Sequence, residues 1–287
     1  MISEWTLARG RLFEPAPFCL VGIVNVTPDS FYDGGRHHDA DKAVAHGLTL
    51  LEQGAGMLDL GAESTRPGAQ PLGATIDEAC TVEEARLLPV LEGLRRERPE
   101  AALCVDTCHA RTARRSLELG ADVINDVSAW ERDPSLLDVL VDRKPGYVLM
   151  HGGDKGSSRS NGQGPVLDRV LRFFEQRLDS LIRAGLPEDR IVLDPGIGFG
   201  KTPQESLDLL RNTYRLHALG RPLYVGLSMK SLFGDVLGLP LEERGAVTDV
   251  AVTMLAERGV PYHRVHDVRS AAAALAVGQW FGSRDEA

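Results

Sequence analysis

Polar and charged side chains stand where successive apolar runs of this chain end. A short apolar run that finishes on a carboxylate, amide or cation has the pattern of a buried strand with a functional group at its carboxyl end. A single buried Asp in such a place more often caps a helix than takes part in chemistry. Eight such ends in one chain are difficult to explain as caps. They carry Asn25, residues 63–68, Asp106, Asn125 with Asp126, His151, Asp194, Ser228 with Lys230, and Arg264 with His266.

Two cationic residues near the end of the chain can point at one ligand. Arg264 and His266 are two residues apart, so on a strand their side chains share a face. His263 and His266 are three apart and cannot share a face, which argues against a His-x-x-His metal pair. With Arg66 and Lys230, the first two predict a site for a phosphate or diphosphate.

A second group of strand-end residues suits a different part of a ligand. Asp106 and Asp194 supply hydrogen-bond acceptors, and Asn125 supplies an amide. This combination favours a flat heterocycle that carries several N–H donors.

The glycine-rich stretch from Gly196 to Thr202 is similar to known nucleotide-binding loops but fits none of them. A Walker A loop would need its first glycine where Pro195 stands, and in a dinucleotide fingerprint the third glycine would come one residue later. We expect these glycines to let the backbone approach a planar ligand beneath Asp194. Lys201 is predicted to lie on the surface rather than to bind phosphate.

Strand-like and helix-like stretches alternate from residue 18 to residue 281. The predicted strands are 18–26, 57–62, 103–107, 123–127, 147–151, 191–195, 223–228 and 262–268. The predicted helices are 40–54, 81–98, 110–120, 134–143, 166–185, 203–219, 243–258 and 270–281, and Thr81 with Glu84 is taken as a capping box at the start of the second. Eight strand–helix units in strict alternation predict parallel strands closed into a single-domain α/β TIM barrel, (β/α)8. The residues before Phe18 are expected to form a strand pair or a lid under the barrel.

Composition narrows the class of protein. The 287 residues include 43% hydrophobic and 25% charged residues, an ordinary globular composition. No apolar run is long enough for a membrane span, and the N-terminal residues lack the apolar centre of a signal peptide. A formal net charge of -9 argues against a nucleic-acid partner. The four cysteines show no metal or disulfide spacing, so we expect buried thiols and a cytoplasmic protein.

Taken together, the motifs resemble those of dihydropteroate synthases, which belong to the superfamily of pterin-binding barrels. The resemblance runs from Gly22 to Val268, and its motifs occur in a specific order and spacing. They are GIVNVTPDSFYDGG (22–35), DLGAESTRPGA (59–69), VDT (105–107), INDV (124–127), LMHG (149–152), LDPGIGFGKT (193–202), VGLSMKS (225–231) and RVHDV (264–268).

The resemblance implies a transferase of folate biosynthesis and a sulfonamide target. It would condense p-aminobenzoate with 7,8-dihydropterin-6-ylmethyl diphosphate to give dihydropteroate and diphosphate. Residues 1–287 would form one pterin-binding domain, with 1–17 as an extension, and the protein would be a homodimer without nucleic-acid or membrane partners.

The same resemblance assigns roles to residues of this sequence. Asn25 would bind the Mg²⁺ cofactor that carries the diphosphate. Asp106, Lys230, Arg264 and His266 are the residues expected to act in catalysis. The pterin would be held by Asp106, Asn125, Asp194 and Lys230, the diphosphate by Arg66, Arg264 and His266, and the aminobenzoate would lie beside Thr65, Pro67 and Ser228.

The sequence departs from the family pattern on the aminobenzoate side. Ser228-Met229-Lys230 stands where the family usually has Ser-Arg-Lys, and a Gly-Gly pair follows His151 where Met-Gln-Gly is common. Three alternatives therefore remain open. They are a pterin-binding paralogue without synthase activity, a barrel similar to the methyltetrahydrofolate–corrinoid methyltransferases, and an unrelated barrel acting on sugar phosphates. The cations Lys230, Arg264 and His266 favour diphosphate chemistry over the methyltransferase, and Asp106, Asn125 and Asp194 would have no purpose in a sugar-phosphate enzyme.

Overall fold

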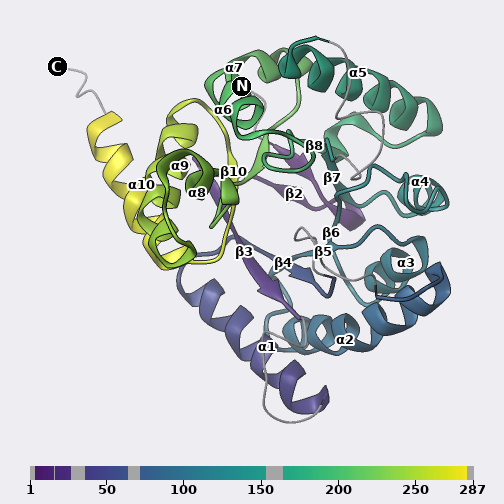
Figure 1. Cartoon of the computed structure of the whole chain (residues 1–287). Coiled ribbons are helices and arrows are strands. Elements are labelled where there is room, and N and C mark those ends of the chain that lie inside the picture. Colours follow the sequence, from purple (N-terminus) through teal and green to yellow (C-terminus); the bar gives the residue numbers. More distant parts are fainter. Residues whose placement is uncertain (1–3, 16, 27–35, 64–71, 153–163, 283–287) are drawn as a thin grey trace.

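The computed structural model describes residues 4–15, 17–26, 36–63, 72–152 and 164–282. Within these ranges, eight parallel strands form one sheet in the order β8-β7-β6-β5-β4-β3-β10-β9. A bridge between Leu193 and Leu223 joins the two edges of the sheet. The sheet thus closes, and helices surround it on the outside (Figure 1). This confirms the predicted TIM barrel.

The strands of the barrel each begin within one residue of their predicted starts. They are β3 (Cys19–Asn25), β4 (Met57–Gly61), β5 (Ala102–Asp106), β6 (Val123–Asp126), β7 (Gly146–Met150), β8 (Ile191–Asp194), β9 (Tyr224–Gly226) and β10 (Tyr262–Val265). The helices are α1 (Arg36–Glu52), α2 (Ile76–Glu97), α3 (Ala110–Glu118), α4 (Leu136–Arg143), α5 (Val166–Ala184), α6 (Pro203–Arg211), α7 (Thr213–Leu216), α8 (Ser231–Leu237), α9 (Arg244–Glu257) and α10 (Val268–Gly282). None of the described helices is long and apolar enough to cross a membrane.

Two of the predicted helices were wrong in their limits. Helix α2 begins at Ile76, and its cap is Thr75, whose side chain accepts a hydrogen bond from the Glu78 N–H at 3.2 Å. Thr81 instead lies inside the helix, where its hydroxyl donates to the Asp77 carbonyl oxygen. The single helix predicted over 203–219 is interrupted at Asn212 and divides into α6, α7 and a 3-10 turn. Helix α8, directly after Lys230, was not predicted.

The register of the strands explains why the polar strand ends meet. Asn25 pairs with Gly61, Gly61 with Asp106, and Asp106 with Asn125. Residues paired across neighbouring parallel strands point to the same side of a sheet, so these side chains lie at one level of the barrel. On the far side, Asp194 pairs with Met150.

Apolar side chains fill the opposite end of the barrel. Trp5 is completely buried there among Met57, Val123, Val192 and other inward-facing strand residues. It packs edge-on against Tyr262, with 5.2 Å between the ring centroids. The predicted strand pair beneath the barrel is confirmed as β1 (Trp5–Thr6) and β2 (Leu12–Phe13), an antiparallel ladder. Because this end is packed with apolar side chains, a ligand can enter only at the carboxyl ends of the strands.

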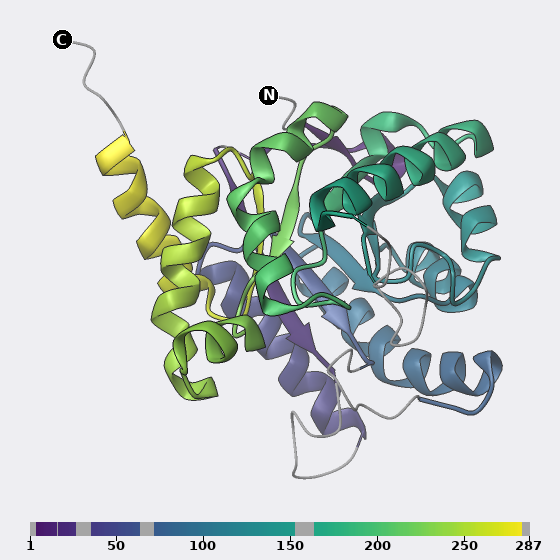
Figure 2. The ribbon, with the colours of Figure 1, turned by 45° about the horizontal axis from the view of Figure 1, so that its top comes forward.

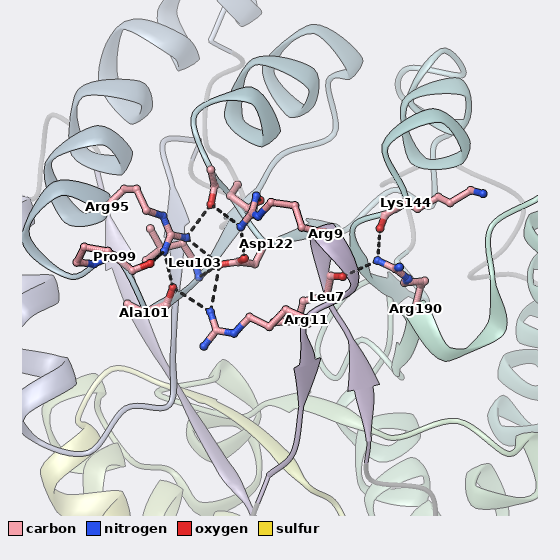
Figure 3. A network of polar contacts seen from close by, with 12 residues as sticks. Leu7, Arg9, Arg11, Arg95, Pro99, Ala101, Leu103, Asp122, Lys144 and Arg190 are labelled. Atoms are coloured by element: carbon pink, nitrogen blue, oxygen red, sulfur yellow. Dashed lines mark hydrogen bonds and ion pairs between the residues drawn. The ribbon is translucent and has the colours of Figure 1, made fainter.

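Arginines fasten this N-terminal pair to the barrel around one buried carboxylate, Asp122 (Figure 3). Arg9 Nη2 donates to Asp122 Oδ1 at 2.6 Å, Arg95 Nη2 donates to Oδ2 at 2.8 Å, and Arg11 lies 3.8 Å away. The Leu103 N–H also donates to Oδ2. Asp122 is fully buried, so its charge depends on these donors.

Replacement of Asp122 by Ala should therefore destabilise the protein by about 3 kcal/mol, as expected when one member of a buried ion-pair network is removed. Urea unfolding would measure the loss. Asp142→Ala is the matched control, since Asp142 is 60% exposed and its pairs with Arg114 and Arg143 should contribute less than about 1 kcal/mol. Equal losses in the two variants would show that the Asp122 network does not fasten the N-terminal segment.

Candidate active site

A guanidinium shared by two carboxylates lies at the centre of the barrel mouth. Arg264, on β10, donates from Nε to Asp59 Oδ2 and from Nη2 to Asp106 Oδ2 at 3.2 Å. Asn125 Nδ2 also donates to Asp59 Oδ2, at 3.1 Å. Asn125 Oδ1 is buried and has no hydrogen-bond partner among the described residues. The amide is thus oriented by Asp59, with its oxygen left as an acceptor.

Sequence analysis did not identify Asp59 as a site residue. It is fully buried in the middle of β4, between Leu58 and Leu60. A carboxylate inside an apolar strand was itself the available signal, because such a charge must have a buried partner. Asp59 was missed because it lies in the middle of its strand, whereas the predicted site residues were those at strand ends.

This arrangement alters the acidity of Asp106. Burial raises the pKa of Asp106 to about 8, and the neighbouring Asp59 carboxylate acts in the same direction, while Arg264 opposes them. The two carboxylates raise the pKa of the Arg264 guanidinium despite its burial. Arg264 therefore stays charged, and Asp106 is the group of this cluster whose protonation can change near neutral pH.

A second pair of charged groups lies on the other side of the mouth. Asp194 ends β8 and accepts a hydrogen bond from the Gly196 N–H at 2.7 Å. Lys230 follows β9, and its Nζ lies 4.1 Å from the centroid of the Phe199 ring, a cation–π contact. Burial lowers the pKa of Lys230 to about 8, while Asp194 opposes the shift. A carboxylate, an ammonium and an aromatic face thus converge here.

Ser228 and His266 complete the mouth on the neighbouring strands. Ser228 Oγ accepts a hydrogen bond from the His266 backbone N–H at 3.2 Å and lies 2.8 Å from His266 Nδ1. Between Ser228 and Lys230, Met229 adopts a positive φ of 59°, and its N–H donates to Thr248 Oγ1 at 3.2 Å. The residue in place of the family's arginine therefore sits in a turn that α9 braces.

One pocket joins these groups. Its walls also include apolar residues such as Ile23, Met150 and Ile197, and this mixture of apolar walls and converging polar groups is typical of small-molecule sites. Seven of the predicted site residues line it: Asp106, Asn125, Asp194, Ser228, Lys230, Arg264 and His266.

The remaining predicted residues have other positions. Asn25 ends β3 at the same mouth and is half-buried, but it does not line this pocket. Thr65, Arg66 and Pro67 lie outside the described residues. The His151 ring is buried against Phe173, with 4.8 Å between the ring centroids. Burial lowers the pKa of His151 to about 3, so this ring is neutral and structural.

The prediction that Lys201 lies on the surface was wrong. Lys201 Nζ donates to three backbone carbonyl oxygens, those of His151, Gly196 and Phe199, at 2.9 to 3.0 Å. The spacing argument excluded phosphate binding by this lysine but gave no indication of where its amine would go.

The described residues offer a magnesium ion one protein ligand at the mouth and no preformed metal site with several protein ligands. No group of three His, Cys, Asp or Glu residues that could hold a metal occurs in the described part of the chain. The amide oxygen of Asn25 is a hard donor at the mouth, and Mg²⁺ often takes most of its ligands from water and substrate phosphates. The residues therefore fit Mg²⁺ that arrives with a phosphate-bearing ligand.

Fold and site together define a barrel that binds a flat heterocycle beside an anion. The chain belongs to the family described as pterin binding enzymes, which matches residues 21–266. Its relatives within that family are dihydropteroate synthases. It is 36% identical over 279 residues to the dihydropteroate synthase of Bacillus subtilis, which covers 94% of each chain. It is 40% identical to a probable bifunctional folylpolyglutamate synthase/dihydropteroate synthase of Halobacterium salinarum, and the match covers 94% of this chain but 32% of that longer protein.

Solved structures give the same result. The structure of Xanthomonas albilineans dihydropteroate synthase with 4-aminobenzoic acid superposes with a TM-score of 0.88 at 38% identity, over 99% of this chain and all of the other. A second structure of that enzyme, with 7,8-dihydropteroate, gives a TM-score of 0.85. The resemblance found from the motifs is thus confirmed.

The raised pKa of Asp106 predicts a particular dependence of stability on pH. Between the ordinary carboxyl value and about 8, the folded protein holds a proton that the unfolded chain has lost, so this residue makes stability fall as pH rises through that range. Asp106→Asn cannot lose a proton, and its thermal unfolding should show a smaller fall between pH 5 and pH 8. The difference should be on the order of 4 kcal/mol, since the window covers about three pH units below a pKa of about 8 and each unit corresponds to about 1.4 kcal/mol. Parallel pH profiles for the variant and the wild type would contradict the assignment.

Proposed function

We propose that this chain is a dihydropteroate synthase and that residues 1–287 act as one pterin-binding domain. It condenses p-aminobenzoate with 7,8-dihydropterin-6-ylmethyl diphosphate and releases diphosphate. The observation that carries the proposal is a single pocket lined both by carboxylate and amide acceptors and by the cationic residues Lys230, Arg264 and His266.

The acceptors suit the pterin ring. Asp194 is fixed by the Gly196 N–H and can accept from neighbouring N–H donors of the heterocycle. Asn125 Oδ1 supplies a further acceptor, and the ammonium of Lys230 supplies a donor. Phe199 and Ile197 provide apolar surface for a flat ring. We assign Asp106, Asn125, Asp194 and Lys230 to the pterin on this basis.

The cations suit the diphosphate and its departure. Arg264, His266 and Arg66 would hold the phosphate oxygens, and Ser228 with Thr65 and Pro67 would border the aminobenzoate. Mg²⁺ bound through Asn25 and the diphosphate would neutralise negative charge on the leaving group. The donors for the anion are side chains already oriented before the substrate binds, such as His266 on Ser228.

The chemistry places the main demand on the leaving group, because an aryl amine is a weak nucleophile. As the bond to diphosphate lengthens, positive charge develops on the methylene carbon and its dihydropterin ring. The ionised form of Asp106 beside the ring favours that charge, and the developing charge in turn favours loss of the Asp106 proton, while Arg264 and His266 favour the departing anion. We infer a dissociative displacement without a covalent intermediate on the protein.

Two other functions use parts of the same pocket. A pterin-binding paralogue would keep the pocket without turnover, and Met229 in place of arginine is the feature that favours it. A methyltetrahydrofolate–corrinoid methyltransferase would use the acidic residues but has no need of Lys230, Arg264 and His266.

The test is diphosphate release from the pterin diphosphate in the presence of Mg²⁺, with and without p-aminobenzoate. Release that requires the aryl amine and yields dihydropteroate is the expected result. Binding of the pterin diphosphate without release would identify the paralogue. Binding of methyltetrahydrofolate, with none of the diphosphate, would identify the methyltransferase.

We also propose that the protein works in the cytoplasm. Cys19, Cys80, Cys104 and Cys108 are all free and buried, which suits a reducing compartment.

Two copies of the chain are proposed to associate through α9 and α10. These helices lie side by side at one flank of the barrel (Figures 1 and 2). Within α10, Ala271 and Leu275 are buried against the barrel. The exposed apolar residues are instead Val250, Met254, Val277, Trp280 and Phe281, from 43% to 85% exposed. An apolar face of two parallel-packed helices can pair with itself about a two-fold axis.

A double variant, Val250→Asp with Met254→Glu, should therefore shift the protein from dimer to a monomer of 31.2 kDa in light scattering. Buried unpaired carboxylates at the centre of the interface would oppose association. Tyr214→Glu, at a residue 63% exposed on α7, is the control and should remain dimeric. A wild-type monomer, or a double variant that still dimerises, would exclude this interface.

A further inference from the structure

Lys201 and its three carbonyl partners form a closed cation site behind the pocket. The oxygens belong to His151, at the end of β7, and to Gly196 and Phe199, in the loop after β8. An ammonium group has three N–H donors, and here each has one carbonyl oxygen within 3.0 Å. The group therefore has no donor left for a phosphate.

The backbone is shaped to make this site. Gly196 has a positive φ of 65°, and a Cβ at this position would come within 2.1 Å of the His151 carbonyl oxygen. The absence of a side chain thus lets two carbonyls approach one point. The Gly196 carbonyl oxygen also accepts from the Phe199 N–H at 3.0 Å. Three carbonyl dipoles that converge would repel one another without a cation between them.

The segments held by this cation carry ligand-facing groups. The His151 N–H donates to the Asp194 carbonyl oxygen at 2.9 Å, and the Gly196 N–H donates to the Asp194 carboxylate at 2.7 Å. Phe199 is the ring against which Lys230 rests. Lys201 therefore fixes the backbone segments of His151 and Gly196 that bond to Asp194 and the segment that carries the Phe199 ring, although Lys201 itself does not line the pocket.

We propose that Lys201 is a positioning residue that acts as a built-in monovalent cation, and that removal of its amine leaves a carbonyl site which ammonium can fill. The effect on the ligand rests on the proposed pterin function, whereas the cation site itself does not. The other charged groups near Lys201 Nζ are Asp194 and Glu205, opposed by Lys230 and Arg169, so no net surplus of positive charge repels an added cation.

The experiment compares Lys201→Met with the wild type at pH 6.5. Burial lowers the pKa of Lys201 to about 7, so at this pH the wild-type amine is largely charged. Methionine has a side chain of similar shape that ends one heavy atom short of the lysine Nζ, so the charge and the donors are lost and their position is left open. Lys144→Met, at an exposed lysine, is the matched control. Each protein is measured in ammonium chloride and in tetramethylammonium chloride of equal ionic strength, because tetramethylammonium has no N–H donor and is too large for the site.

Two readouts separate the cation site from the pterin function. Thermal unfolding of Lys201→Met without ligand should show a lower midpoint that ammonium raises and tetramethylammonium does not. Titration calorimetry with the pterin diphosphate should show about tenfold weaker binding, partly restored by ammonium alone. If the wild type binds no pterin diphosphate, the proposed function fails while the thermal readout still tests the cation site.

Three results would overturn the inference. They are an unchanged midpoint and affinity in Lys201→Met, a loss that neither salt restores, and a recovery that is equal in both salts. If the variant does not fold, the accessibility of Lys201 can be measured in the wild type. Acetic anhydride should then modify Lys144 much faster than Lys201 in the folded protein, and equal rates would contradict a lysine held by three carbonyls.

Discussion

The ion pair between Asp59 and Arg264 is the interaction on which the site depends. Asp59 is fully buried, where an unpaired charge would be very unfavourable, and Arg264 is half-buried, so the ion pair holds both side chains in one place. Asp59 comes from β4 and Arg264 from β10, and β3 lies between these strands in the sheet. The ion pair therefore links two strands that are separated in the sheet by β3. It also sets the orientation of the Asn125 amide and brings the guanidinium to Asp106.

The rest of the barrel keeps this pair rigid by closing the other end. Trp5 and the inward-facing apolar residues fill the lower interior, and the arginines around Asp122 fasten the N-terminal segment beneath them. Because this end is closed, the charged groups at the mouth are poorly solvated from below. That poor solvation is the physical cause of the raised pKa of Asp106 and the lowered pKa of Lys230.

The strands and most of the residues at the barrel mouth could be predicted from the sequence, because both depend on local sequence pattern. A β-branched apolar run ending on a polar residue fixes the strand, and strict alternation with helices fixes which ends meet. The start of α2 was missed because Thr75 and Thr81 both precede a Glu by three residues, and only packing decides between them. Asp59 and Lys201 were missed for a related reason. Their partners, Arg264 and the carbonyl of His151, are 205 and 50 residues away in the chain, and no spacing rule connects them.

The polar residues at the mouth divide according to how their hydrogen bonds are satisfied. Lys201 gives all three donors to the backbone, and the buried His151 ring packs on Phe173, so both are structural. Asp59 holds the Arg264 guanidinium in place, and that guanidinium stays charged beside the pocket. The protonation of Asp106 on β5 and of Lys230 after β9 can change when a ligand binds. These groups lie on separate strands of one closed sheet, so the barrel can present a carboxylate and an ammonium to different parts of the ligand without letting the two pair directly with each other.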